Sequence, residues 1–212
     1  MNGIVYTIGH STHSIETFVG LLKRHDISVV SDVRSRPYSR TNPQFNREDL
    51  KGALKDAQIK YVFLGKELGA RSEDESCYRN GQVQYDLLSK TDLFKRGIER
   101  VLEGASQFRI ALMCAEKEPL DCHRTILVAR ALNELGVEIK HILGNGQIED
   151  HTQAIERLIN RLRMPGADMF REHNAIVADA YARRGNEIAY REEAPDKRPN
   201  DKSGLSTFRA AE

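Results

Sequence analysis

Six side chains that could take part in catalysis or binding lie within eleven residues near the middle of the chain. They are Cys114, Glu116, Lys117, Cys122, His123 and Arg124. The apolar run that ends at Cys114 predicts a buried strand, and the amphipathic stretch from Cys122 predicts a helix. In open α/β sheets, strand ends leave a crevice, and helix N-termini present unpaired N–H groups to anions. The segment therefore predicts an active or binding site.

Polar side chains also follow the other predicted strands. They are His10 and Ser11 after the first strand, Asp32, Arg34, Arg36 and Arg40 after the second, and Arg71 after the third. Because the carboxyl ends of parallel strands meet at one edge of a sheet, these loops and the segment after Cys114 should converge on one crevice.

The cations in these loops predict an anion-binding cradle. Its members are Arg34, Arg36, Arg40, Arg71, Lys117 and Arg124. Guanidinium groups bind phosphate or carboxylate in a planar, bidentate way. The alternative is a solvated basic loop whose arginines are neutralised by nearby carboxylates, and the spacing of Asp32 and Arg34 predicts one such ion pair. Ser11 and His123 are also predicted to contact the substrate, although either could instead cap a helix.

Four residues are predicted to be catalytic. Asp32 and Glu116 are the carboxylates expected in the crevice, as general acid, general base or nucleophile, with ordinary ion pairs as the alternative. His10, which follows a glycine, is favoured over His123 as the acid or base. Cys122 lies beside a helix start, a setting that lowers a thiol pKa, although buried cysteines are also common core residues.

Metal binding by Cys114, Cys122, His123 and His10 is a further alternative. The Cys-x7-Cys-His spacing matches no standard zinc pattern, and adjacent ligands rarely both point inward. No metal ligand is therefore assigned, the cofactor stays unknown, and Cys77 is interpreted as incidental.

The wider pattern alternates apolar runs with amphipathic stretches. Strands are predicted at Ile4–Ile8, Ser28–Val33, Tyr61–Leu64, Arg109–Cys114 and Glu138–Leu143. Helices are predicted at Ser14–His25, Arg47–Gln58, Tyr85–Glu103 with a break near Thr91, Cys122–Leu135 and Asp150–Leu162. The alternation predicts a three-layer α/β fold, with a mainly parallel five-stranded sheet and helices on both faces. A polar loop is predicted from Gly65 to Gln82, long enough to be functional.

The chain is expected to divide into an α/β domain over 1–165, a helical extension over 166–193 and a disordered tail over 194–212. Lys plus Arg (32) nearly balances Asp plus Glu (31), so no overall charge marks nucleic acid or a membrane as the partner. Three cysteines, with no signal peptide and no long apolar run, favour a cytoplasmic location. Association into a homo-oligomer is left open.

Several of these motifs together resemble the DUF488 family, a domain of unknown function. The matching stretches include Thr7-Ile-Gly-His-Ser11, Asp32-Val-Arg-Ser-Arg-Pro37, Leu68-Gly69, Cys114-Ala-Glu116, Cys122-His-Arg124 and His141-Ile142. The similarity spans about residues 4–150 and departs from the family at Ala70, where another glycine is common. It implies a compact α/β domain with these motifs at one pole, and no particular reaction.

The leading functional hypothesis is a small cytoplasmic hydrolase or transferase acting on a phosphate-bearing substrate such as a nucleotide or nucleic acid. Arginines would hold the anion, while Asp32 or Glu116, assisted by His10, would handle the chemistry. The alternatives are a non-catalytic ligand- or nucleic-acid-binding module, and a thiol- or metal-dependent enzyme that uses Cys122.

Overall fold

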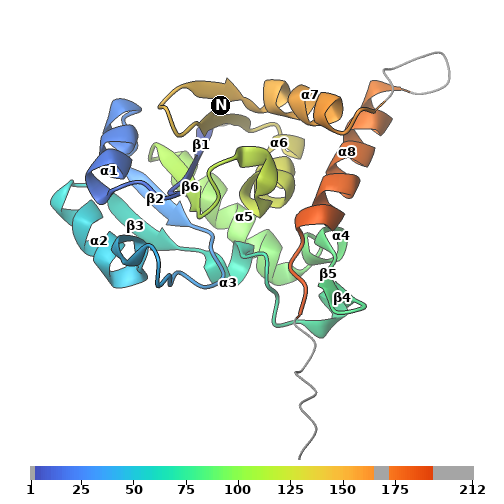
Figure 1. Ribbon diagram of the computed structural model, residues 1–212, viewed down its shortest axis with the longest axis horizontal. Helices are drawn as coiled ribbons and strands as arrows, with labels where there is room; N and C mark the ends of the chain where they lie inside the picture. Colours follow the sequence, from blue (N-terminus) through green and yellow to red (C-terminus); the bar gives the residue numbers. More distant parts are fainter. Residues whose placement is uncertain (1–2, 165–171, 193–212) are drawn as a thin grey trace, which may run out of the picture.

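A six-stranded sheet forms the centre of the protein, for which a computed structural model describes residues 3–164 and 172–192 (Figure 1). Its strand order is β3-β2-β6-β1-β7-β8. The strands are β1 (Ile4–Gly9), β2 (Val29–Asp32), β3 (Lys60–Phe63), β6 (Ile110–Cys114), β7 (Glu138–Ile142) and β8 (Ile148–Asp150). The first five are parallel, and β8 pairs antiparallel with β7. The predicted mainly parallel α/β fold is confirmed, but the predicted number of five strands was wrong.

The additional strand, β8, has a sequence that gives little strand signal. It contains three residues, of which Ile148 and Asp150 are exposed, so no apolar run marks it. A tight turn returns the chain from β7 to β8, and Gly146 in this turn has a φ of 81°, a conformation that favours glycine. The turn, and not the sequence of the strand itself, accounts for this short edge strand.

Helices cover both faces of the sheet. They are α1 (Ile15–Arg24), α2 (Arg47–Asp56), α3 (Gly65–Leu68), α4 (Tyr85–Leu88), α5 (Asp92–Ala105), α6 (Arg130–Glu134), α7 (His151–Arg161) and α8 (His173–Ile188). Short 3₁₀ turns cover Pro43–Phe45, Glu75–Cys77 and Pro119–Asp121, and a π-helical stretch over Arg124–Ala129 leads into α6. The break expected near Thr91 lies between α4 and α5, where the Thr91 hydroxyl accepts a hydrogen bond from Phe94 N.

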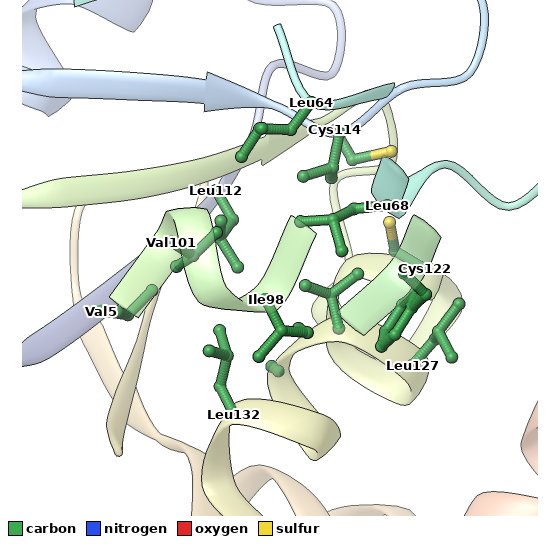
Figure 2. Close-up of a cluster of buried hydrophobic side chains, with 14 of the residues drawn as sticks. Val5, Leu64, Leu68, Ile98, Val101, Leu112, Cys114, Cys122, Leu127 and Leu132 are labelled. Carbon is green, nitrogen blue, oxygen red and sulfur yellow. The ribbon is translucent and has the colours of Figure 1, made fainter. Parts of the chain in front are cut away.

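Alternation along the strands creates two apolar faces. In β6, Ala111 and Met113 pack with α1 and α2, whereas Leu112 and Cys114 pack with α5 and the π-helical stretch. Figure 2 shows the second face, where Leu112, Cys114 and Cys122 lie in one cluster with side chains of α5. The two faces complete the three predicted layers, and they place Cys114 at the carboxyl end of a buried central strand.

Two predicted segments are more structured than expected. The polar loop predicted from Gly65 to Gln82 contains α3, a 3₁₀ turn and β4 (Tyr78–Arg79), and β4 pairs with β5 (Gln82–Val83). The helix predicted to start at Cys122 starts after it, because Cys122 itself has an extended backbone that ends the preceding 3₁₀ turn. This extended residue helps to set the direction of its side chain at the sheet edge.

The last described element returns to this edge. In Figure 1, α8 runs from the end of α7 toward the β4–β5 hairpin. Val83 N donates a hydrogen bond to Tyr190 O, and Gln82 and Arg191 form an antiparallel bridge. The tail expected over 194–212 lies outside the described residues. Within 3–164 and 172–192, no helix combines the length and apolar character needed to cross a membrane.

Candidate functional site

The loops after β1 and β6 are joined closely at the carboxyl edge of the sheet. His10 N donates to Cys114 O, and Ser11 N donates to Ala115 O, each at 2.9 Å. A Cβ atom on Gly9 would lie 1.9 Å from Glu116 O, so only glycine permits this approach. The Gly-His-Ser motif therefore holds the segment that carries Glu116 against the end of β1.

Asp32 and Arg34 form the predicted ion pair, and it is almost completely buried. Arg34 Nε and Nη2 donate to the two Asp32 oxygens at 2.9 and 2.7 Å, while Tyr61 Oη donates to Asp32 Oδ2 at 2.8 Å. Arg34 also donates to Phe45 O and, from Nη1, to His10 Nε2. We call His10, Asp32, Arg34 and Tyr61 the arginine network; nearly all of its polar groups have protein partners.

His10 belongs to this network as a neutral imidazole. Its Nε2 accepts from Arg34, so Nδ1 carries the proton that is donated to Ser11 O at 2.9 Å. The ring also stacks on Phe45. Burial lowers the pKa of His10 to about 4, and the charge of Arg34 acts in the same direction. Both ring nitrogens are therefore occupied within the protein.

Arg124 is fully buried beneath the segment that carries Glu116. Its Nη1 donates to Glu116 O at 2.7 Å and its Nη2 to Lys117 O at 3.5 Å. Its Nε has no hydrogen-bond partner in the described structure, and no described carboxylate pairs with its charge. Arg124 therefore supports the loop through its backbone carbonyl groups.

The side chains of Cys114, Cys122 and His123 meet next to this network; we call these three residues, with Glu116, the thiol cluster. His123 Nδ1 lies 3.7 Å from Cys114 Sγ and 3.9 Å from Cys122 Sγ. Cys122 Sγ donates to Glu116 Oε2 at 2.8 Å, and Figure 2 shows this sulfur directed toward that of Cys114. The predicted alternative set of metal ligands is thus brought together except for His10, which lies in the arginine network.

The cluster perturbs the acidity of its own groups. Burial raises the pKa of Cys114, and the neighbouring Cys122 adds to this shift. Burial also acts to raise the pKa of Cys122, but the hydrogen bond from Cys114 and the charge of Arg124 outweigh it and lower that pKa. Glu116 is exposed as a residue, yet its carboxyl group is withdrawn toward Cys122, and burial followed by that contact raises its pKa.

A pocket of about 300 Å³ opens beside the thiol cluster. Its lining includes Arg36, Arg71, Cys114, Glu116, His123 and Tyr190. The lining comes from the loops after β2, α3 and β6, from the start of α4, and from the end of α8 with the chain that follows it, so three of the four predicted loops contribute to it. Arg34 of the arginine network is among the lining residues. The loop with His10 and Ser11 lies outside the lining.

Several predicted site residues take other positions. Arg40 and Lys117 are exposed outside the pocket, and Ser11 is half-buried with a φ of 51°. Asp32 and Cys122 are buried and do not line the pocket.

The comparisons with known proteins identify one relationship. The model of the family described as domain of unknown function DUF488 matches residues 14–131, more than half of the chain. The chain belongs to the DUF488 family. A search of curated proteins and a search of solved structures found no match.

The DUF488 match covers part of the candidate site. It contains Asp32, Arg34 and the whole thiol cluster, whereas His10 and Tyr190 lie outside it. Tyr190 is a pocket residue that sequence reasoning missed. Its position depends on the return of the chain after α8, for which the local sequence gives no signal.

Proposed function

We propose that this DUF488 protein is an enzyme, a hydrolase or transferase, that acts on a phosphate-bearing substrate in the pocket beside the thiol cluster. The observation that carries the proposal is a single pocket in which two exposed arginines, Arg36 and Arg71, share the lining with Glu116, beside the buried Arg34. A volume of about 300 Å³ lies at the lower end for small-molecule sites, so a nucleotide or one end of a nucleic acid suits it.

Arg36 and Arg71 provide the anion-binding part of the proposal. Both are exposed, and neither has an ion-pair partner within the part of the chain that the structure describes. The Arg71 guanidinium lies 4.3 Å from the centre of the Tyr190 ring, which orients it without neutralising its charge. Guanidinium groups without an ion-pair partner favour an anion such as phosphate, because the planar guanidinium can donate two hydrogen bonds to its oxygens.

Glu116 is the proposed general acid or base. It is the one predicted catalytic residue that lines the pocket, and it makes no ion pair with a described residue. The proposal gives His10 and Asp32 a positioning role, because Arg34 engages both of them. Cys122 is not used as a nucleophile, because its sulfur is buried behind the pocket wall and reactive thiols need access.

The test compares binding with turnover on the same compounds. Inorganic phosphate, pyrophosphate, nucleoside mono- and triphosphates and short single-stranded oligonucleotides are assayed by thermal shift and by product formation. We expect at least one compound to stabilise the protein and to be converted. Glu116→Gln should lower turnover by about 100-fold or more while leaving stabilisation by the compound in place.

Arg36 and Arg40 make a matched pair for the anion site. They lie on the same loop, both are exposed, and only Arg36 lines the pocket. Arg36→Ala or Arg71→Ala should weaken binding by about tenfold or more, because a hydrogen bond to a charged group is lost. Arg40→Ala should change it by less than about twofold. Stabilisation without any turnover would replace the enzyme with a non-catalytic binding module, and equal effects at Arg36 and Arg40 would refute this pocket as the site.

A further inference from the structure

We infer that Cys114, Cys122 and His123 bind a zinc ion at the floor of the pocket. The three candidate ligand atoms, two sulfurs and one ring nitrogen, all lie within 4.8 Å of one another. Cys114 ends β6, whereas Cys122 and His123 are consecutive residues: Cys122 has an extended backbone after a 3₁₀ turn, and His123 directly precedes the π-helical stretch. Two thiolates and an imidazole are a ligand set that zinc prefers over magnesium or calcium.

The spacing of the atoms fits tetrahedral coordination. With zinc–sulfur and zinc–nitrogen bonds of about 2.3 and 2.0 Å, tetrahedral angles separate sulfur from nitrogen by about 3.5 Å. The observed separations from His123 Nδ1 are 3.7 Å to Cys114 Sγ and 3.9 Å to Cys122 Sγ. Both sulfur–nitrogen separations are therefore within a few tenths of an ångström of those in a tetrahedral zinc site.

The hydrogen bonding of His123 prepares it as a ligand. Its Nε2 lies 3.0 Å from Val33 O, and because a carbonyl oxygen only accepts, Nε2 must donate. In the neutral ring, Nδ1 then carries the lone pair, and this atom faces the two sulfurs. A backbone carbonyl on the remote ring nitrogen is the usual partner of a metal-bound histidine, since it fixes both the tautomer and the ring orientation.

The surroundings also suit a cluster with thiolate ligands. Arg124 N donates to Cys122 Sγ at 3.4 Å, a contact that stabilises negative charge on the sulfur. When zinc binds, the two thiols release their protons to solvent, and two thiolates neutralise the ion.

Three protein ligands leave a fourth coordination position. Cys114 and His123 line the pocket, as does Glu116, so this position faces the pocket and the Glu116 carboxylate. Glu116 Oε2 lies 2.8 Å from Cys122 Sγ, closer than the roughly 3.5 Å expected between two zinc ligands. We therefore assign the fourth position to water, with Glu116 beside it. The use of this water in catalysis rests on the proposed function, but the binding of zinc does not.

The test measures metal directly. The full-length protein is produced in zinc-supplemented medium, and we expect elemental analysis to find about one zinc ion per chain. After removal of metal by a chelator under reducing conditions, Co²⁺ is added as a spectroscopic probe. Thiolate-to-cobalt absorption in the near ultraviolet, with intense visible bands, would indicate a tetrahedral site with sulfur ligands. Zinc affinity is then measured by competition with a coloured chelator.

Matched variants separate the site from other cysteines and histidines. Cys114→Ala, Cys122→Ala and His123→Gln should each lower zinc affinity by more than about 100-fold, beyond the usual effect of a residue that only supports a ligand. Cys77→Ala and His25→Gln are the controls, because these residues lie outside the cluster. Circular dichroism checks that each variant folds. If the cysteine variants do not fold, the zinc affinity of His123→Gln alone tests the site.

Two results would overturn the inference. One is zinc binding that is unchanged in all three cluster variants. The other is a Cys114–Cys122 disulfide in the purified protein, together with no zinc or cobalt uptake after reduction. Zinc binding without turnover of any phosphate compound would support the metal site and count against the proposed function. Turnover by the metal-free protein would support the proposed function and exclude a zinc-bound water from it.

Discussion

The arginine network and the thiol cluster lie side by side at one edge of the sheet and are made of equally reactive residue types. They differ in what their polar atoms contact. In the network, Asp32 receives hydrogen bonds from Arg34 and Tyr61, and both nitrogens of His10 are engaged. In the cluster, His123 Nδ1 faces two sulfurs, and Cys114, Glu116 and His123 border a pocket. The first arrangement joins two opposite charges, and the second brings two thiols and an imidazole together at a pocket.

This difference separates structural from chemical roles better than residue type does. A buried group whose hydrogen bonds are all made contributes to folding, and removing one partner leaves the other desolvated and unpaired. A group that keeps donors or lone pairs available beside a pocket can contact a substrate or an ion. We therefore expect substitutions in the network to change stability most, and substitutions in the cluster to change binding and turnover.

The largest effect is expected from Asp32→Ala. The substitution leaves Arg34 buried without its carboxylate, since the side chains of the pair are 7% and 0% exposed. Breaking such a buried pair typically costs about 3–5 kcal/mol in the free energy of unfolding. Urea denaturation measures the loss.

Two other substitutions serve as controls for Asp32→Ala. Glu48→Ala removes an exposed partner of Arg47 and should cost less than about 1 kcal/mol. Glu116→Gln, in the thiol cluster, should change stability by less than about 1.5 kcal/mol, because the amide oxygen can still accept the hydrogen bond from Cys122 and no ion pair is lost. If Asp32→Ala cost no more than these two, the network would not be a stabilising element.

A second buried polar arrangement predicts how the stability of the protein depends on pH. Thr7, His141, His151 and Tyr181 form a buried hydrogen-bonded chain, with contacts of 2.8, 3.0 and 2.8 Å. Burial lowers the pKa of His151 from 6.5 to about 4. The unfolded chain therefore binds more protons between these two values, so stability falls as the pH is lowered through this window.

At one pKa unit per roughly 1.4 kcal/mol, His151 alone should account for a loss of up to about 3 kcal/mol by pH 4. Above pH 6.5 this residue should contribute no pH dependence. Denaturation at a series of pH values, with His151→Gln as the comparison, measures the effect. The variant should have a smaller slope between pH 6.5 and 4, and an unchanged slope would show that His151 is not held neutral in the folded protein.

Sequence patterns predicted the sheet but not this division of roles. The buried strands were recognisable because runs such as Ile110–Cys114 are wholly apolar, and the parity of Asp32 and Arg34 predicted their ion pair. The edge strand β8 was missed because its three residues carry no apolar run. The sequence also could not reveal that Arg124 would be fully buried, since its partners are carbonyl groups that any residue could supply.

The contents of the pocket were equally hard to predict. Tyr190 reaches it through backbone contacts between the chain after α8 and β5, which depend on tertiary packing. The direction of His123 Nδ1 depends on a hydrogen bond to Val33, 90 residues away. Local sequence indicated which residue types lay near the sheet edge, while long-range hydrogen bonds decided which of them faced the pocket.

Within the network, Tyr61→Phe should have a moderate effect. It removes only the hydroxyl that donates to Asp32 Oδ2 and leaves the ring in place. Hydrogen bonds to charged groups contribute about 1.5–3 kcal/mol, and we expect the lower end because Arg34 still pairs with the carboxylate. Urea denaturation of Tyr61→Phe and Asp32→Ala under the same conditions tests whether Asp32→Ala loses more stability. A loss as large as that of Asp32→Ala would mean that the hydroxyl, and not the ion pair, is the main support.

The smallest effect is expected at Tyr190, on the pocket side of the comparison. Its ring lies against the Arg71 guanidinium, and such a contact is worth about 0.5–1 kcal/mol at an exposed site. Tyr190→Ala should therefore weaken pyrophosphate binding by up to about fivefold, because Arg71 loses its orientation. Tyr190→Phe keeps the ring and should bind as the unchanged protein does. Isothermal titration with pyrophosphate distinguishes the two variants. Equal weakening in both would assign the effect to the hydroxyl, and no weakening in either would show that Arg71 does not need the ring to bind an anion.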